Sequence, residues 1–179
     1  MLAKEFIARL KFMAPSIDLL IDSGLTVKDA NNIIDKYIGA EKTSSQQVEY
    51  NNELLLLLDR FDLRKVEVLL ITFNESVRQD LDFYYIGKVE VDHLVINKTT
   101  NEIQVLEFDD PRNHLWDCAK NGEKFLDALI KCVSFSNQCM FDDDLYNDSN
   151  AILKAAKEYS IVAGGEKYEE FYKMILGYF

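Results

Sequence analysis

Two apolar segments joined by a short polar turn constrain the fold of this chain more than any other part of the sequence. Residues 91–97 and 103–108 are rich in β-branched and aromatic side chains, and the Lys-Thr-Thr-Asn-Glu between them is typical of a turn. Leu94 and Ile96 share one face of the first segment, and apolar residues also lie on its other face. We therefore expect an antiparallel hairpin inside a sheet that is covered on at least one side.

Two more segments favour strands, and most of the remaining regular structure is expected to be helical. Residues 66–73 and 83–89 are short runs of strand composition, whereas the five leucines at 54–58 fit a helix or a strand. Polar connections are expected at 40–52 and 142–149. Apolar residues at helical spacing predict helices over residues 2–13, a short stretch ending at Gly24, 27–38, 119–134, 150–159 and 166–177. Helices that precede and follow an antiparallel meander predict an α+β fold.

The length and composition of the chain suit one globular domain. With 179 residues, of which 48% are hydrophobic and 28% charged, the chain can bury a substantial core. We expect one domain over residues 1–179, with 142–179 as a helical C-terminal extension. The first residues carry charges within their apolar stretch, and the three cysteines form no CxxC pair, so we expect a cytoplasmic protein.

The charge balance limits the partners that the chain can have. It has 20 basic and 31 acidic residues, which give a formal net charge of −11. Nucleic acids and anionic membrane surfaces need Lys and Arg, so neither is expected as a direct partner. A basic protein partner is compatible with this charge, although acidity also serves simply to keep a domain soluble.

The residues that could support catalysis or metal binding do not form a convincing pattern. There is no glycine-rich phosphate loop and no GxSxG elbow. A zinc site from His93, His114 and Cys118 is conceivable, but their spacing does not support it. Asp92 and Glu107 lie on consecutive predicted strands, as the carboxylates of Mg²⁺-dependent nucleases do, but the lysine expected two residues after Glu107 is absent. No catalytic residue, metal ligand or cofactor is therefore predicted.

The segment 83–129 resembles the SUKH superfamily, the SMI/KNR-like group that includes many bacterial toxin-immunity proteins and fungal cell-wall regulators. The family has a Thr-x-Glu-Ile pattern where its return strand begins, and residues 100–103 match this pattern. The helix that follows has the family's pattern of small, polar and apolar residues at Ala119, Asn121, Phe125 and Leu126. The Gly-x-Leu-Pro signature near the family's first helices is absent, so the resemblance is weaker upstream.

This resemblance implies a curved, mainly antiparallel sheet packed against N- and C-terminal helices, and a non-enzymatic role. Immunity proteins of this type bind a cognate toxin, often a nuclease, and block it. A regulator or adaptor that binds a housekeeping protein is the alternative, and a Mg²⁺-dependent nuclease using Asp92 and Glu107 ranks below both. Aromatic anchors and carboxylates are the expected partner-binding residues, which are Tyr84, Tyr85, Asp109, Asp110, Asp142, Asp143 and Asp144.

Overall fold

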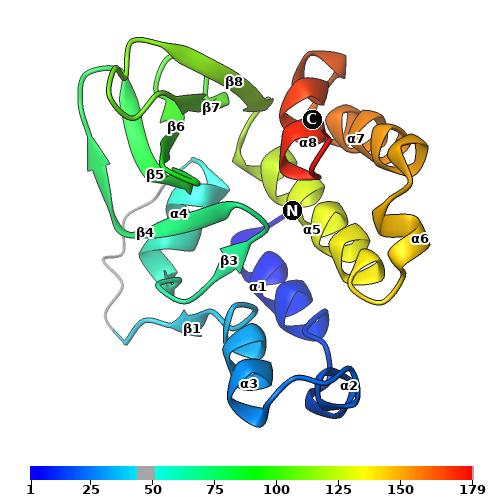
Figure 1. Cartoon of the computed structure of the whole chain (residues 1–179). Coiled ribbons are helices and arrows are strands. Elements are labelled where there is room, and N and C mark those ends of the chain that lie inside the picture. The colour runs from blue at the N-terminus through cyan, green and yellow to red at the C-terminus, as the bar shows by residue number, and fades with distance from the viewer. Residues whose placement is uncertain (44–50, 179) are drawn as a thin grey trace.

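A curled six-stranded sheet forms one side of the molecule, and helices pack on the other (Figure 1). The computed structural model describes residues 1–43 and 51–178. Each strand of the sheet pairs antiparallel with the next one along the chain, so the sheet is a meander that closes into a half-barrel. The strands are β3 (Glu67–Val68), β4 (Ile71–Gln79), β5 (Phe83–Val89), β6 (Asp92–Asn97), β7 (Ile103–Leu106) and β8 (His114–Ala119). The predicted α+β fold with a curved antiparallel sheet is confirmed.

The hairpin predicted from the sequence is the β6–β7 pair. Leu94 lies opposite Val105 and Ile96 opposite Ile103, and all four side chains belong to the main core. The predicted bounds were too wide, because Val91 lies in the β5–β6 turn and the second strand ends at Leu106. In that turn Glu90 has a φ of 54°, a conformation in which few side chains continue a strand.

Two predictions around the sheet were wrong. The single strand expected at 66–73 is interrupted at Leu69, whose φ is 54°, and the chain turns there from β3 into β4. Residues 114–119 form the unpredicted strand β8, so the following helix begins at Gly122 and not at residue 119. The sequence of β8 mixes polar and apolar residues without strict alternation, and its pairing with β7 rather than its local pattern makes it a strand.

The helices agree with the sequence predictions more closely. They are α1 (Ala3–Phe12), α2 (Ile17–Asp22), α3 (Val27–Asp35), α4 (Glu53–Arg60), α5 (Gly122–Cys139), α6 (Asp143–Tyr146), α7 (Ser149–Ala163) and α8 (Glu169–Ile175), with the 3₁₀ turn η1 (Glu166–Tyr168) before α8. The five leucines at 54–58 belong to α4. The connection at 142–149 is not purely irregular, because α6 lies within it.

The expected loop at 40–52 is only partly described. Residues 44–50 lie outside the described residues. Within the described part, β1 (Ala40–Glu41) pairs with β2 (Phe61–Asp62), so the start of this segment is a short strand and the prediction of a loop was wrong there. None of the helices in residues 1–43 and 51–178 combines the length and apolarity needed to cross a bilayer.

One hydrophobic core connects the sheet with helices from both ends of the chain. It includes buried residues of α1, α4, α5, α7 and α8 together with the inner face of the sheet. Phe125 of α5 and Phe171 of α8 lie with ring centroids 6.2 Å apart, and neither side chain is exposed. The other face of the sheet carries a small separate cluster of Tyr85, Val95 and Leu106.

The C-terminal helices also contact the C-terminal end of the edge strand β8. The hydroxyl of Tyr172 donates a hydrogen bond of 3.0 Å to the carbonyl of Cys118 in β8. The N–H of Lys120, just after β8, donates to the carbonyl of Ala163 at the end of α7, at 2.9 Å. Because an uncovered edge strand exposes unpaired backbone groups, these contacts protect this end of the edge from pairing with other chains.

Candidate functional site

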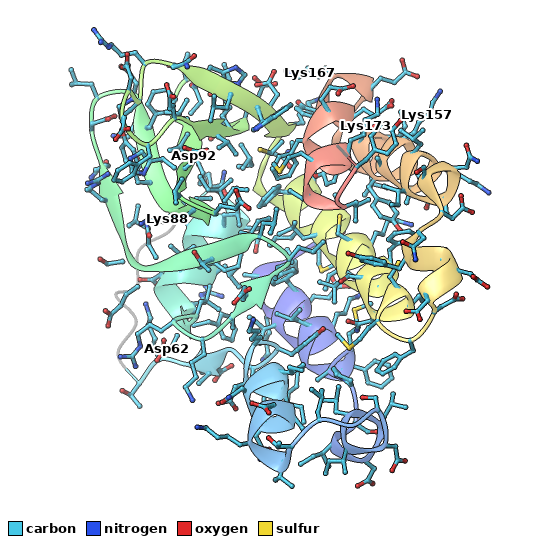
Figure 2. All side chains as sticks on the ribbon, viewed as in Figure 1. Asp62, Lys88, Asp92, Lys157, Lys167 and Lys173 are labelled. Atoms are coloured by element: carbon cyan, nitrogen blue, oxygen red, sulfur yellow. The ribbon has the colours of Figure 1, made fainter. Side chains whose placement is uncertain are left out.

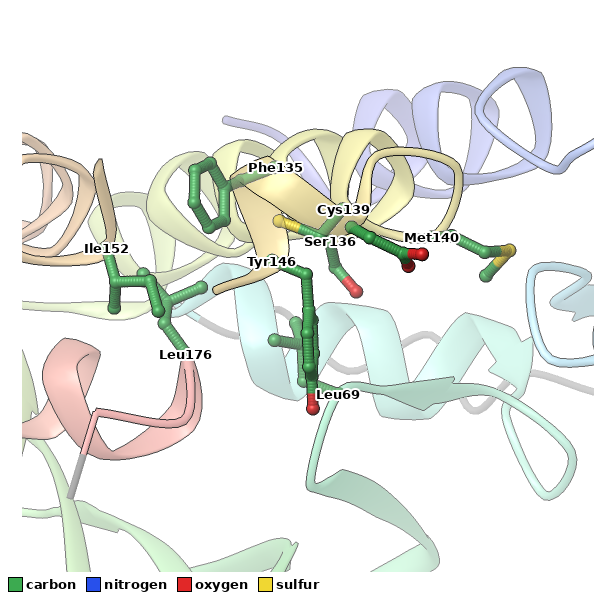
Figure 3. A pocket seen from close by; sticks show the side chains of 9 residues that line it. Leu69, Phe135, Ser136, Cys139, Met140, Tyr146, Ile152 and Leu176 are labelled. Atoms are coloured by element: carbon green, nitrogen blue, oxygen red, sulfur yellow. The ribbon is translucent and has the colours of Figure 1, made fainter. Parts of the chain in front are cut away.

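An apolar groove of about 400 Å³ lies where the end of α5, the short helix α6 and the start of α7 meet the β3–β4 turn. Its apolar walls include Leu69, Phe135, Tyr146, Ile152 and Leu176. Figure 3 shows Tyr146 standing over the turn that carries Leu69, with Phe135, Ile152 and Leu176 at one end of the groove. Residues far apart in the sequence therefore form one hollow.

The local sequence explains why α6 stands at the rim of this groove. α5 ends at Cys139, and Asp142 then caps α6 through its Oδ1 atom, which accepts a hydrogen bond of 3.0 Å from the N–H of Leu145. The carboxylates of Asp143 and Asp144 occupy the first turn of α6, where the helix dipole favours negative charge. Three neighbouring carboxylates are in this way held on one exposed turn.

Large apolar side chains flank these carboxylates in the sequence and are exposed beside them. Met140, Phe141 and Tyr146 are 43%, 45% and 65% exposed. Exposed apolar groups together with carboxylates are the elements that bind a protein with apolar and basic groups. We call this set the α6 surface, and it consists of Met140, Phe141, Asp142, Asp143, Asp144 and Tyr146.

The groove contains one thiol, that of Cys139. Burial, and then the nearby carboxylate of Asp142, raise the pKa of Cys139. The thiol is therefore protonated at neutral pH and is a weak nucleophile. The Cys139 side chain is therefore better suited to pack against a partner than to react with it.

The two predicted tyrosines of β5 lie away from the α6 surface. Tyr85 is 6% exposed, its hydroxyl donates a hydrogen bond of 2.7 Å to Asp80, and Arg78 covers its ring at 4.5 Å. Tyr84 is partly buried, and the ammonium of Lys98 lies 4.6 Å from its ring centroid. Both rings are therefore already engaged within the protein.

The predicted pair Asp109 and Asp110 lies in the loop between β7 and β8. Asp109 is exposed. Asp110 accepts two hydrogen bonds from the guanidinium of Arg112, at 2.8 and 3.1 Å, and these bonds lower the pKa of its carboxyl. Figure 1 shows β7 and β8 on the side of the molecule opposite α6. The predicted carboxylates thus divide between two separate surfaces, of which only that of α6 adjoins an apolar groove.

The carboxylates considered for a nuclease both have partners within the protein. Asp92 accepts a hydrogen bond of 3.0 Å from the N–H of Phe108, and Glu107 accepts one of 2.9 Å from the side-chain amide of Asn113. Of the zinc ligands considered, His114 lies 3.1 Å from Asp117, and Cys118 is fully buried. Within the described residues, no group of three or more His, Cys, Asp or Glu side chains is arranged to hold a metal ion.

The exposed apolar part of the α6 surface was missed from the sequence. The composition of residues 142–149 predicts only an acidic polar connection, and it does not single out Met140, Phe141 and Tyr146. The sequence Met-Phe-Asp-Asp-Asp-Leu-Tyr does contain a usable signal, because large apolar residues directly flank three carboxylates.

No family model, no curated protein and no solved structure matches this chain. The function is therefore inferred from the chemistry of its surfaces and from the resemblance of residues 83–129.

Proposed function

We propose that this protein is a non-enzymatic immunity protein that binds a protein toxin and blocks it, acting in the cytoplasm. The observation that carries the proposal is the α6 surface, where three carboxylates and three exposed apolar side chains adjoin a groove. The resemblance of residues 83–129 to the SUKH superfamily supports the same role. The compartment is inferred from Cys118, Cys132 and Cys139, which are all free thiols.

The physical basis of this proposal is complementarity with a nucleic-acid-cleaving toxin. A nuclease needs a basic cleft to hold its phosphate substrate. Carboxylates placed in that cleft compete with the substrate and accelerate the encounter, while buried apolar anchors slow dissociation. In the α6 surface the apolar side chains Met140, Phe141 and Tyr146 would supply the anchors.

Growth rescue is the direct test. Each protein encoded next to this gene that arrests growth when expressed is co-expressed with the chain, and we expect one of them to be neutralised through a 1:1 complex. Replacing Asp142, Asp143 and Asp144 together by Asn should slow association with that toxin roughly tenfold at low salt. Asn can still cap α6, so the fold is expected to remain intact.

A control variant removes the same number of charges elsewhere. Asp18→Asn, Asp22→Asn and Glu166→Gln are exposed changes outside the groove, and they should leave association unchanged. If the two triple variants slow association equally, only the total charge matters and the α6 surface is not the binding site.

The two alternative functions, an adaptor or regulator and a Mg²⁺-dependent nuclease, predict different results. Recovery of a housekeeping protein in a pull-down, without neutralisation of any neighbouring toxin, would favour an adaptor or regulator. Cleavage of nucleic acid that requires Mg²⁺ and is lost in Asp92→Ala would show a nuclease and contradict the immunity role.

A further inference from the structure

A second hollow, of about 430 Å³, opens on the sheet beside the bulge of β4. Its lining includes Asn74 and Arg78 of β4, Tyr85 and Lys88 of β5, His93 of β6 and Phe108 after β7. Lys88 lies directly opposite His93 in the β5–β6 ladder, so both side chains point to the same face of the sheet. We call this hollow the sheet pocket.

An aromatic row forms the floor of the sheet pocket. The rings of Tyr85 and His93 are perpendicular, with centroids 5.3 Å apart, and those of His93 and Phe108 are 5.6 Å apart. A cation lies at each end of the row. The guanidinium of Arg78 is 4.5 Å from the centroid of Tyr85, and the ammonium of Lys88 is 5.9 Å from the centroid of Phe108.

Neither cation forms a salt bridge with a carboxylate of residues 1–43 or 51–178. Among the described residues, no Asp or Glu oxygen lies within 4.0 Å of the charged nitrogens of Arg78 or Lys88. Glu75 also lines the sheet pocket, and its carboxylate lies 3.9 Å from the guanidinium of Arg64. A chain of net charge −11 thus places two cations in the lining of one hollow.

The histidine between the two cations is kept neutral. Burial, and then the charges of Arg78 and Lys88, lower the pKa of His93, while the carboxylate of Asp92 opposes them. A neutral imidazole offers one N–H donor and a flat ring face. The sheet pocket therefore combines two positive charges, polar donors and aromatic walls.

We propose that the sheet pocket binds a small organic anion, whose phosphate or carboxylate group is attracted by Arg78 and Lys88 and whose planar part lies against the aromatic row. Its volume is within the range of sites for small molecules. Arg and Lys bind phosphate and carboxylate through charge-assisted hydrogen bonds, and the amide of Asn74 can add a neutral donor. This ligand is independent of the protein partner at the α6 surface.

Titration of the full chain followed by NMR tests this proposal. Phenyl phosphate and benzoate are the two anionic probes, and benzyl alcohol is the uncharged control. We expect saturable shifts centred on His93 and Phe108 for at least one anion and none for benzyl alcohol. The anion that binds with the higher affinity shows whether the pocket prefers phosphate or carboxylate.

The double variant Arg78→Gln/Lys88→Gln should weaken binding of the anion at least roughly tenfold. Its matched control is Lys154→Gln/Lys157→Gln, which removes two exposed positive charges from α7. Figure 2 shows Lys88 on the sheet and Lys157 on the opposite side of the molecule. Equal weakening by both variants would mean unspecific attraction and would overturn the proposal.

A second measurement follows the imidazole itself. A bound anion offsets the charges of Arg78 and Lys88, so the pKa of His93 should rise when the probe saturates the protein. Absence of saturation by both anions overturns the proposal, as does binding that leaves the pKa of His93 unchanged. Saturation by a phosphotyrosine peptide but not by phenyl phosphate would also overturn it, in favour of a protein ligand.

Discussion

Tyr168 shows how a single side chain ties the C-terminal helices to the sheet. Its hydroxyl donates a hydrogen bond of 3.0 Å to Glu102, which lies in the turn of the β6–β7 hairpin, and Lys167 pairs with the same carboxylate. Burial, and then the bond to Glu102, raise the pKa of Tyr168 to about 12 from an ordinary value of 10.0. The Tyr168 phenol therefore links the β6–β7 turn to η1. It also makes the free energy of unfolding depend on pH in the alkaline range.

The sign of this dependence follows from which state ionises first. The phenol of Tyr168 loses its proton near pH 10.0 in the unfolded chain and near pH 12 in the folded one. Its contribution to stability is present below pH 10.0 and is lost as the pH rises to 12. In Tyr168→Phe, the free energy of unfolding should fall less steeply over this range, as measured by urea unfolding under reducing conditions. Tyr146→Phe, at an exposed position, is the control, and equal slopes in both variants would contradict this account.

At the scale of one element, α4 is buried on most of its surface. Its leucines pack between the sheet and α1, and Leu54 and Leu57 are not exposed at all. The side chain of Asn52 caps the helix, accepting a hydrogen bond of 3.0 Å from the N–H of Leu54, and Asn52 is itself only 7% exposed. Glu53 joins α4 to α1 by accepting a hydrogen bond of 2.7 Å from the N–H of Ala3.

The cap gives a prediction for the stability of α4. Asn52→Ala leaves the N–H of Leu54 buried without an acceptor, so we expect a loss of about 1–2 kcal/mol in the free energy of unfolding. Asn52→Ser keeps a side-chain oxygen at this position and should recover much of that loss. Urea denaturation of the three proteins measures the difference. Equal destabilisation by Ala and Ser would show that packing, and not the cap, matters here.

The elements that could be predicted from the sequence are those whose pattern is local. Thr26 and Asn121 are residue types that favour the position before a helix, and each accepts a hydrogen bond from a backbone N–H at the start of α3 and α5. The leucines of 54–58 fit a helix or a strand equally well, because five consecutive apolar residues show no periodicity by themselves. Strand β8 depends on pairing with β7, which is a long-range effect.

At the scale of the whole molecule, buried residues of α7, η1 and α8 belong to the main core. Phe171 and Tyr172 of α8 are fully buried, and Phe171 lies against Phe125 of α5. A chain ending at residue 142 would expose this surface and free the edge of β8. We expect it to lose cooperative thermal unfolding and to aggregate, whereas a chain ending at Leu176, which retains α8, should unfold cooperatively. A soluble, cooperatively folded 1–142 fragment would instead support a dispensable extension.

The candidate sites could be predicted only in part, because their geometry is a property of the whole fold. The net charge of −11 and the carboxylates at 142–144 indicated an acidic surface, but not that a groove would lie beside it. The sheet pocket had no sequence signal. Arg78 follows a register shift in the β4–β5 ladder and Lys88 follows one in the β5–β6 ladder, and register in a bulged ladder is set by tertiary packing.

The covering of β8 by α8 also has a consequence for biosynthesis. Tyr172 follows Cys118 by 54 residues, so a ribosome that adds roughly 5–20 residues per second needs several seconds to make the covering helix after the strand. During that delay the nascent sheet presents unsatisfied amides and carbonyls to its neighbours. When many ribosomes translate one message, the exposed strands of neighbouring nascent chains could then pair with each other. Slower translation initiation should therefore raise the yield of soluble protein when that yield is low.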